Sequence, residues 1–115
     1  MATGTIRYLD NVTDLPITAT AGSGVTIRSF NFHKIGRIVF GYIYFDVTSA
    51  LSDNSLIATL SSGLPELYDP YATAAVCSSG SVGMVYIGKA RNAIKTWGPI
   101  STGTENYAQF VYVAR

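Results

Sequence analysis

The sequence predicts an all-β domain, an antiparallel β-sandwich built from about eight short strands. Tyr, Val, Ile, Thr, Ser and Gly are prominent and only 13% of the residues are charged, a composition typical of strands. No window sustains apolar residues at the i, i+3, i+4, i+7 spacing of a helix. Short apolar runs recur at intervals near the ~8–12 residues expected of sandwiches and barrels. A chain of 115 residues fits one compact domain.

The stretch Gly36 to Val47, GRIVFGYIYFDV, is predicted to be the strand around which the domain is organised. Successive side chains of a strand point to opposite faces, and here both faces are apolar. One face holds Val39, Ile43, Phe45 and Val47, with Gly41 leaving a gap among them. The other face holds Ile38, Phe40, Tyr42 and Tyr44 and ends at Asp46. Such a strand needs two covering surfaces, and in a short chain the second can be another subunit.

The N-terminal residues precede the first long apolar strand. Residues 4–9 (GTIRYL) predict a short strand or an extended arm. Residues 11–24 are rich in Thr, Ala, Gly and Ser and contain Pro16, which predicts a loop or connecting arm. We therefore expect residues 1–24 to be an N-terminal strand or arm and residues 25–115 to form the sandwich.

Val25 to Lys34 is the predicted strand before the central one. Its apolar residues change face between Ile27 and Phe30, and this slip of one residue predicts a β-bulge near residues 28–29. The segment that follows is a tight hairpin in which Gly36 is expected to take a positive φ.

The remaining predicted strands are shorter and are separated by polar or glycine-containing turns. They are Leu56 to Leu60, Tyr71 to Cys77, Val82 to Ile87, Ala93 to Trp97 and Tyr107 to Val113. The longest irregular piece, Ser61 to Pro70 (SSGLPELYDP), contains two prolines and a glycine. Residues 100–106 are expected to be a polar loop.

Charge and cysteine content exclude several classes of protein. The formal net charge of +1 gives no electrostatic footprint for nucleic acid or an anionic membrane. No apolar run is long enough to insert into a membrane, and the N-terminus lacks the profile of a signal peptide.

The single cysteine, Cys77, allows no internal disulfide and is interpreted as a buried small hydrophobic residue. Low charge with eight tyrosines and five phenylalanines favours a surface partly covered by partner chains.

The residues available for catalysis are few. The only histidine, His33, lies on a strand, and we interpret it as a half-buried or interface residue instead of a catalytic base. One histidine with one cysteine cannot supply a closed zinc site. Glycoside cleavage needs two carboxylates, and Glu66, Asp69 and Glu105 are interpreted as solvated loop acids. The sequence therefore predicts no enzymatic activity, no metal and no cofactor.

Binding is better supported than catalysis. Trp97, the only tryptophan, ends a predicted strand just before Gly98-Pro99, and aromatic faces in such positions stack against sugar rings. Polar and aromatic neighbours on the connecting loops would contact the sugar hydroxyls. The candidate ligand-binding residues are Trp97, Arg91, Asn92, Asp69 and Tyr71. The alternative is that Trp97 fills the core or an interface.

The order of segments FHKIGRIVFGYIYF, LIATLSSGLPELYDP and VGMVYIGKARNAIKTW, followed by a closing aromatic strand, resembles the C-terminal head domains of tailed-phage and prophage tail fibres and baseplate proteins. The resemblance covers Val25 to Val113. Two loops depart from the family pattern: Ser61 to Gly63 are an extension, and the turn after Ile87 reads GKARN in place of Asp-Gly. The matching residues are Lys34, Gly36, Val39, Gly41, Leu64, Pro65, Tyr68, Pro70, Val85 and Ile87.

The resemblance implies a jelly-roll-like homotrimer in the virion tail, made in the bacterial cytoplasm, that binds a host cell-surface glycan or a similar polymer on the bacterial surface. Residues 1–24 would then join the head domain to upstream fibre or baseplate modules. Trimerisation would cover the aromatic face of the central strand, so the candidate interface residues are Phe40, Tyr42, Tyr44 and His33. The alternatives are a purely structural tail or baseplate module, a cellular lectin-like domain and a polysaccharide depolymerase.

Overall fold

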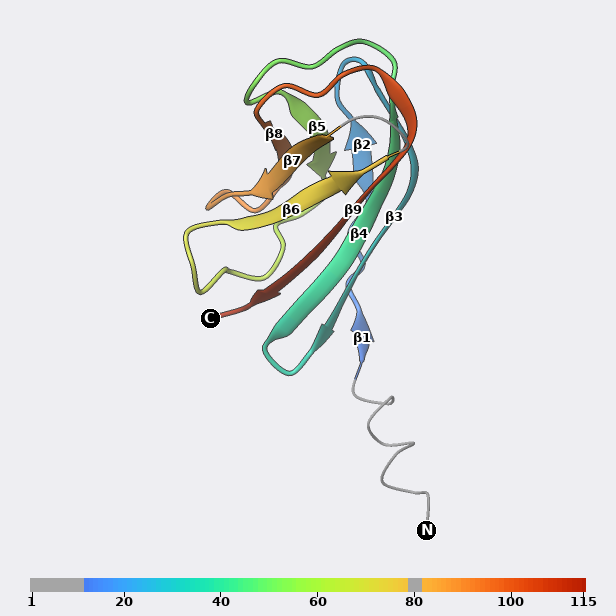
Figure 1. Cartoon of the computed structure of the whole chain (residues 1–115). Coiled ribbons are helices and arrows are strands. Elements are labelled where there is room, and N and C mark those ends of the chain that lie inside the picture. Colours follow the sequence, from blue (N-terminus) through green and yellow to red (C-terminus); the bar gives the residue numbers. More distant parts are fainter. Residues whose placement is uncertain (1–11, 79–81) are drawn as a thin grey trace.

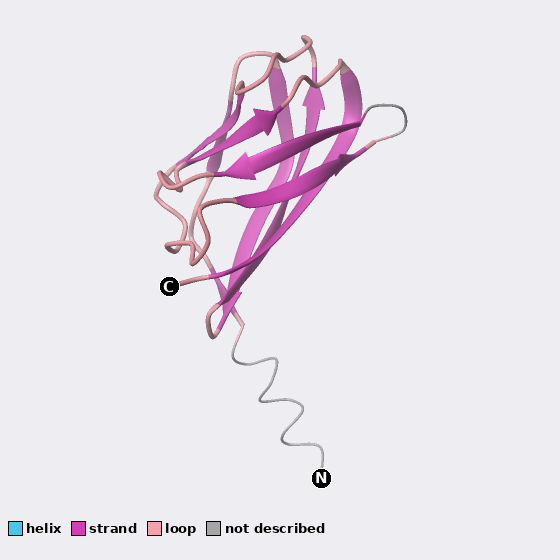
Figure 2. Ribbon diagram, turned by 60° about the vertical axis from the view of Figure 1, so that its left-hand side comes forward, coloured by secondary structure: helices cyan, strands magenta, loops and turns pink. Residues whose placement is uncertain are grey.

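The computed structural model describes residues 12–78 and 82–115, and in them nine strands form one antiparallel sheet. The strands are β1 (Thr13–Asp14), β2 (Ala19–Ala21), β3 (Val25–Ile35), β4 (Ile38–Val47), β5 (Leu56–Leu60), β6 (Ala72–Cys77), β7 (Val82–Ile87), β8 (Ala93–Trp97) and β9 (Gly103–Val113). Their order across the sheet is β1-β3-β4-β9-β6-β7-β8-β5-β2. The sheet curls into a half-barrel, which brings β2 at one end against β3 near the other (Figures 1 and 2).

The all-β, antiparallel prediction is confirmed, since the described residues contain no helix. It follows that none of these residues belongs to a helix that could cross a membrane. The predicted bounds of β5, β7 and β8 are confirmed to the residue. The predicted strand at residues 4–9 lies outside the described residues, and the domain boundary after residue 24 stays a prediction.

Three sequence predictions are wrong in detail. Residues 11–24 are not all loop, because β1 pairs with β3 and β2 pairs with β5. Residues 103–106 belong to β9, because the Glu105 N–H finds an acceptor in the Asp46 carboxylate and Asn106 turns into the core. Cys77 is exposed, because alternation along β6 buries Ala72, Ala74 and Val76 and turns Cys77 outward.

The core lies on the inner face of the curled sheet, and β4 supplies its centre. The inward side chains of β4 are almost fully buried, whereas the outward ones remain partly exposed. Phe32 of β3 lies opposite Gly41 in the register and fills the gap that this glycine leaves. The Phe32 ring also packs against Phe110 of β9, with ring centroids 6.0 Å apart.

The predicted bulge and hairpin are both confirmed. The register between β3 and β4 shifts between Ile27 and Ser29, so residues on either side of the shift face the core. Without the extra residue, Val25 and Phe32 would lie on opposite faces of the sheet. Gly36 adopts a φ of 58° in the turn that joins β3 to β4.

The close approach at Gly41 makes a testable prediction. A Cβ added at this position would collide with the Phe32 ring and the Asn31 carbonyl oxygen. We expect Gly41→Ala to lower the free energy of unfolding by about 1–3 kcal/mol, as overpacking of a core does. Urea denaturation of the purified domain measures this change.

Gly63→Ala is the matched control. Its Cβ would meet only the Arg91 Cβ at 3.9 Å, so we expect a change within about 0.5 kcal/mol. Equal stability of Gly41→Ala and the wild type would contradict the proposed packing.

Candidate functional site

Three aromatic rings meet on the outer face of the sheet, and we call them the aromatic cluster: Tyr71, Tyr86 and Trp97. Tyr71 precedes β6, Tyr86 lies on β7 and Trp97 ends β8. The three pairs of rings are edge-to-face, with centroids 5.2–5.7 Å apart. Trp97 and Tyr71 are each 51% exposed, so the cluster presents aromatic surface to solvent while its own contacts hold it in place.

The loop between β4 and β5 supplies a polar rim to the cluster. The Tyr86 hydroxyl donates to Asn54 Oδ1 at 2.6 Å, and the Gly98 N–H donates to Asp53 Oδ1 at 2.7 Å. Asn54 has a φ of 61°, a conformation that asparagine tolerates better than most residues. The cluster, Thr96 and the two rim residues line a depression of about 370 Å³. We call it the aromatic depression.

A buried hydroxyl fixes this rim. The Thr96 side chain is fully buried, and its Oγ1 donates to the Ser52 carbonyl and accepts from the Ser55 N–H, both at 2.8 Å. The backbone of Thr96 also pairs with the loop, accepting from the Asn54 N–H at 3.1 Å. Since Ser52, Asn54 and Ser55 all bond to one buried strand residue, the polar groups of this part of the loop are pre-organised.

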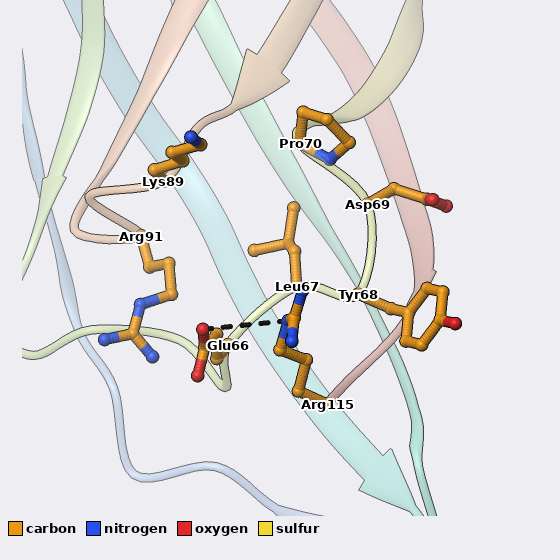
Figure 3. A pocket seen from close by; sticks show the side chains of 8 residues that line it. All are labelled: Glu66, Leu67, Tyr68, Asp69, Pro70, Lys89, Arg91 and Arg115. Carbon is orange, nitrogen blue, oxygen red and sulfur yellow. Dashed lines mark ion pairs between the residues drawn. The ribbon is translucent and has the colours of Figure 1, made fainter.

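A second depression of about 510 Å³ lies between the turn that joins β7 to β8 and the loop before β6 (Figure 3). We call it the basic depression. Lys89 and Arg91 face it from the turn, and Glu66 pairs with Arg115 at 3.8 Å on the opposite side. Its lining residues are Glu66, Leu67, Tyr68, Asp69, Pro70, Lys89, Arg91 and Arg115.

Arg91 connects this turn to the loop. It has a φ of 60°, and its backbone carbonyl accepts from the Leu64 N–H at 2.9 Å. Its Nη1 donates to the Leu64 carbonyl at 3.2 Å. The Tyr112 hydroxyl donates to the neighbouring Pro65 carbonyl at 2.7 Å, and burial raises the pKa of Tyr112 to about 12. The loop is therefore bonded to the rest of the domain at two successive residues, to Arg91 through Leu64 and to Tyr112 through Pro65.

Four of the five predicted ligand-binding residues line the two depressions, two in each. Trp97 and Tyr71 lie together in the aromatic depression, and Asp69 and Arg91 line the basic one. Asn92 lines neither, and its backbone carbonyl accepts from the Leu60 N–H at 2.8 Å.

Sequence reasoning missed Tyr86, Asp53 and Asn54 as site residues. Alternation along β7 could have placed Tyr86 outward, because the flanking Val85 and Ile87 are both apolar and buried. Nothing in the sequence indicated that the turn at residues 52–55 lies beside β8.

The outer faces of β3, β4 and β9 carry the predicted interface residues. Phe40, Tyr42 and Tyr44 are half-buried there, and the Tyr42 ring stacks on Tyr107 with centroids 5.5 Å apart. The ring centroids of His33 and Phe40 are 5.2 Å apart, and His33 Nδ1 bonds to an Asp14 carboxylate oxygen.

Exposed apolar residues extend this surface along β9 and the start of β4. They are Val111 (62% exposed), Val113 (44%) and Ile38 (40%). We call the whole surface the outer apolar face.

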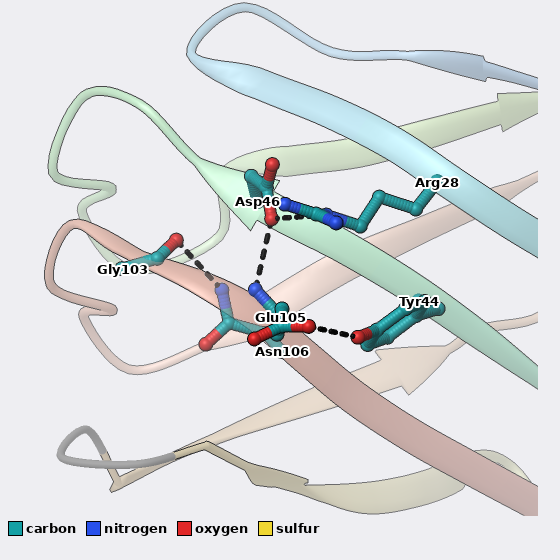
Figure 4. A network of polar contacts seen from close by, with 6 residues as sticks. All are labelled: Arg28, Tyr44, Asp46, Gly103, Glu105 and Asn106. Carbon is teal, nitrogen blue, oxygen red and sulfur yellow. Dashed lines mark hydrogen bonds and ion pairs between the residues drawn. The ribbon is translucent and has the colours of Figure 1, made fainter.

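A polar network closes one end of this face (Figure 4). Asp46 Oδ1 accepts from Arg28 Nε and from the Glu105 N–H, both at 2.8 Å. These bonds, that of Arg28 first, hold the pKa of Asp46 below its ordinary value. The Glu105 carboxylate accepts from the Tyr44 hydroxyl at 2.9 Å, which raises the pKa of Tyr44. Next to it, the buried Asn106 donates to the Gly103 carbonyl at 3.1 Å.

The chain matches no protein-family model, and a search of the curated proteins finds no match. Within residues 12–78 and 82–115, no three His, Cys, Asp or Glu side chains are grouped as metal ligands.

The Asp46 network predicts a pH-dependent contribution to stability. Because the folded pKa of Asp46 lies below 3.8, its contribution is present above that pH and is lost as the pH falls through the folded value. We expect Asp46→Asn to be less stable than the wild type at pH 7, with the difference shrinking below about pH 4. Urea denaturation of both proteins between pH 2.5 and 7 measures this.

Arg28→Gln provides the control through a double-mutant cycle. In that background the effect of Asp46→Asn on stability should depend less on pH, because the first cause of the pKa shift is gone. A penalty for Asp46→Asn that is the same at pH 3 and pH 7 would show that the charge of Asp46 contributes nothing to stability.

Proposed function

We propose that this chain is a non-catalytic adhesion module of a phage tail fibre or baseplate, which binds a bacterial cell-surface saccharide at the aromatic depression. The observation that supports this most is the half-exposed Trp97 beside Tyr71, with a polar rim at residues 53–54. The apolar faces of sugar rings pack on aromatic rings, while carboxylate and amide groups bond to their hydroxyls. The family resemblance in the sequence points to the same class of ligand.

The rigidity of the depression favours binding. Ordering side chains and loops on association costs free energy, about 0.5–1.5 kcal/mol for each flexible side chain. Here the rings support one another and the rim is bonded to Thr96, so less order has to be imposed when a ligand arrives. Of the acids near the two depressions, Asp53 bonds to the Gly98 N–H and Glu66 pairs with Arg115, which favours binding over acid–base chemistry at these two groups.

Assembly as a homotrimer with a jelly-roll-like sandwich is part of this proposal. The outer apolar face would lie against neighbouring subunits and would supply the second covering surface that the central strand needs. It joins Phe40 to the exposed Val111 and Val113 across the register of β4 and β9. Three sites on one fibre tip would multiply a weak single-site affinity through avidity.

A purely structural tail module is the second candidate. The extent of the outer apolar face supports it, because contiguous exposed apolar residues mark protein–protein contact surfaces. In that case the face would bind other tail proteins, and the aromatic depression would have no saccharide ligand.

The saccharide proposal predicts that Trp97 dominates binding. On an array of bacterial capsular and lipopolysaccharide glycans, we expect binding by the wild type and a loss of about tenfold or more in affinity for Trp97→Ala. Titration calorimetry with the glycans that bind measures the loss. Trp97 is the only tryptophan, so a ligand that stacks on it should also change the intrinsic fluorescence of the wild type.

Met84→Ala is the matched control for this experiment. Met84 is opposite Trp97 in the register of β7 and β8 and is 43% exposed, but it does not line the depression. Its affinity should equal that of the wild type. Equal losses in both variants, or no glycan binding by the wild type, would favour the structural module.

The trimer proposal predicts a mass in solution of three times the 12.3 kDa chain. Val111→Lys would place a charge in the outer apolar face, and we expect it to reduce the mass to that of a single chain. Light scattering at several protein concentrations measures this. Thr73→Lys, on the exposed side of β6, should leave the mass unchanged. A folded wild-type monomer would contradict the trimer.

A further inference from the structure

We infer that the saccharide is acidic, and that Lys89 and Arg91 in the basic depression bind its carboxylate while a neighbouring sugar ring packs on the aromatic cluster. This inference rests on the proposed function and names the class of its ligand. It depends on two observations, the adjacency of the two depressions and the cations on one wall of the basic one.

The two depressions adjoin along two segments of chain. Pro70 lines the basic depression, and the next residue, Tyr71, lines the aromatic one. On the other side, Gly88 lies against both tyrosine rings, since a Cβ there would be 3.6 Å from Tyr86 and 3.8 Å from Tyr71. The next residue after Gly88 is Lys89 of the basic depression. Consecutive Cα atoms are about 3.8 Å apart, so the two depressions border each other at both segments, within the length of a short oligosaccharide.

The charges on the turn between β7 and β8 are available to a ligand. The ion pairs of residues 12–78 and 82–115 are Arg28–Asp46, His33–Asp14 and Arg115–Glu66, and they include neither Lys89 nor Arg91. Arg91 donates one hydrogen bond to the Leu64 carbonyl, and a guanidinium has five N–H donors.

The position of Arg91 favours recognition of a carboxylate. Its backbone bond to Leu64 holds the turn and its Nη1 bond restrains the side chain beside the depression that it lines, so less order has to be imposed when a ligand binds. Planar guanidinium groups bind carboxylates through two parallel hydrogen bonds, and Lys89 adds a flexible positive charge nearby. The hydroxyls of a neutral saccharide would accept hydrogen bonds from Arg91 but would gain far less from the two positive charges.

The experiment compares each glycan with its carboxyl-reduced form. An array of bacterial capsular and lipopolysaccharide glycans is prepared twice, once native and once with uronic and other sugar carboxylates reduced to alcohols. We expect acidic glycans to bind the wild type at least tenfold more tightly than their reduced forms. Raising the salt concentration from about 50 to about 500 mM should weaken the native glycans selectively.

Variants test whether the preference for native glycans comes from the turn that joins β7 to β8. Lys89→Gln should lose most of the preference for the native glycan and keep its affinity for the reduced one, whereas Trp97→Ala should lose affinity for both. Lys95→Gln removes the same charge from β8, and Lys95 does not line the basic depression, so it should retain the preference. Circular dichroism verifies that each variant is folded.

Three results of this experiment would contradict the inference, and they differ in what they leave of the proposed function. Equal binding of native and reduced glycans that still depends on Trp97 would overturn this inference and leave the proposed function intact. Equal losses in Lys89→Gln and Lys95→Gln would overturn it in favour of general electrostatic attraction. An array on which neither form binds would overturn both proposals.

Discussion

The contact between Phe32 and Gly41 fixes the register on which the rest of the structure depends. The side-chain period of a strand is two, so a slip of one residue would turn the Ile43 side of β4 outward and the Tyr42 side inward. Phe32 occupies the space that the glycine leaves, and no other residue type at position 41 offers that space. The bulge after Ile27 then lets both ends of β3 face the same core. One aromatic side chain therefore determines which residues the sheet exposes.

The consequence is an outer surface that is unusually aromatic. On β4 the tyrosines alternate with the buried Ile43 and Phe45, so they point outward, where Tyr42 stacks on Tyr107 of β9. The same alternation turns Tyr86 and Trp97 outward on β7 and β8. The two sets differ in their borders: the aromatic cluster is edged by polar loop residues, whereas the outer apolar face continues into the exposed Val111. This difference supports assigning a ligand to the first and a protein partner to the second.

Sequence patterns predict the strands well because apolar alternation and turn residues are local signals. Alternation identified both faces of β4, and the change of face in β3 located its bulge within one residue. The site was predicted less completely, because it is assembled from segments that are distant in sequence. Tyr86 and Asn54 are 32 positions apart, and the bond between them exists only because the β4–β5 loop folds beside β8. The polar start of β9 was missed for the same reason, since Asp46 supplies its partner from another strand.

Thr96 shows how the core can determine the geometry of a surface site. A hydroxyl buried without partners costs free energy, and Thr96 avoids that cost by bonding to both Ser52 and Ser55. The bonds hold the loop that carries Asp53 and Asn54, so the positions of the polar rim follow from a requirement of the interior. The neighbouring Trp97 belongs to the same strand and faces the opposite way. One short strand thus carries Trp97 of the aromatic cluster and holds the polar rim, and displacing it would alter the two together.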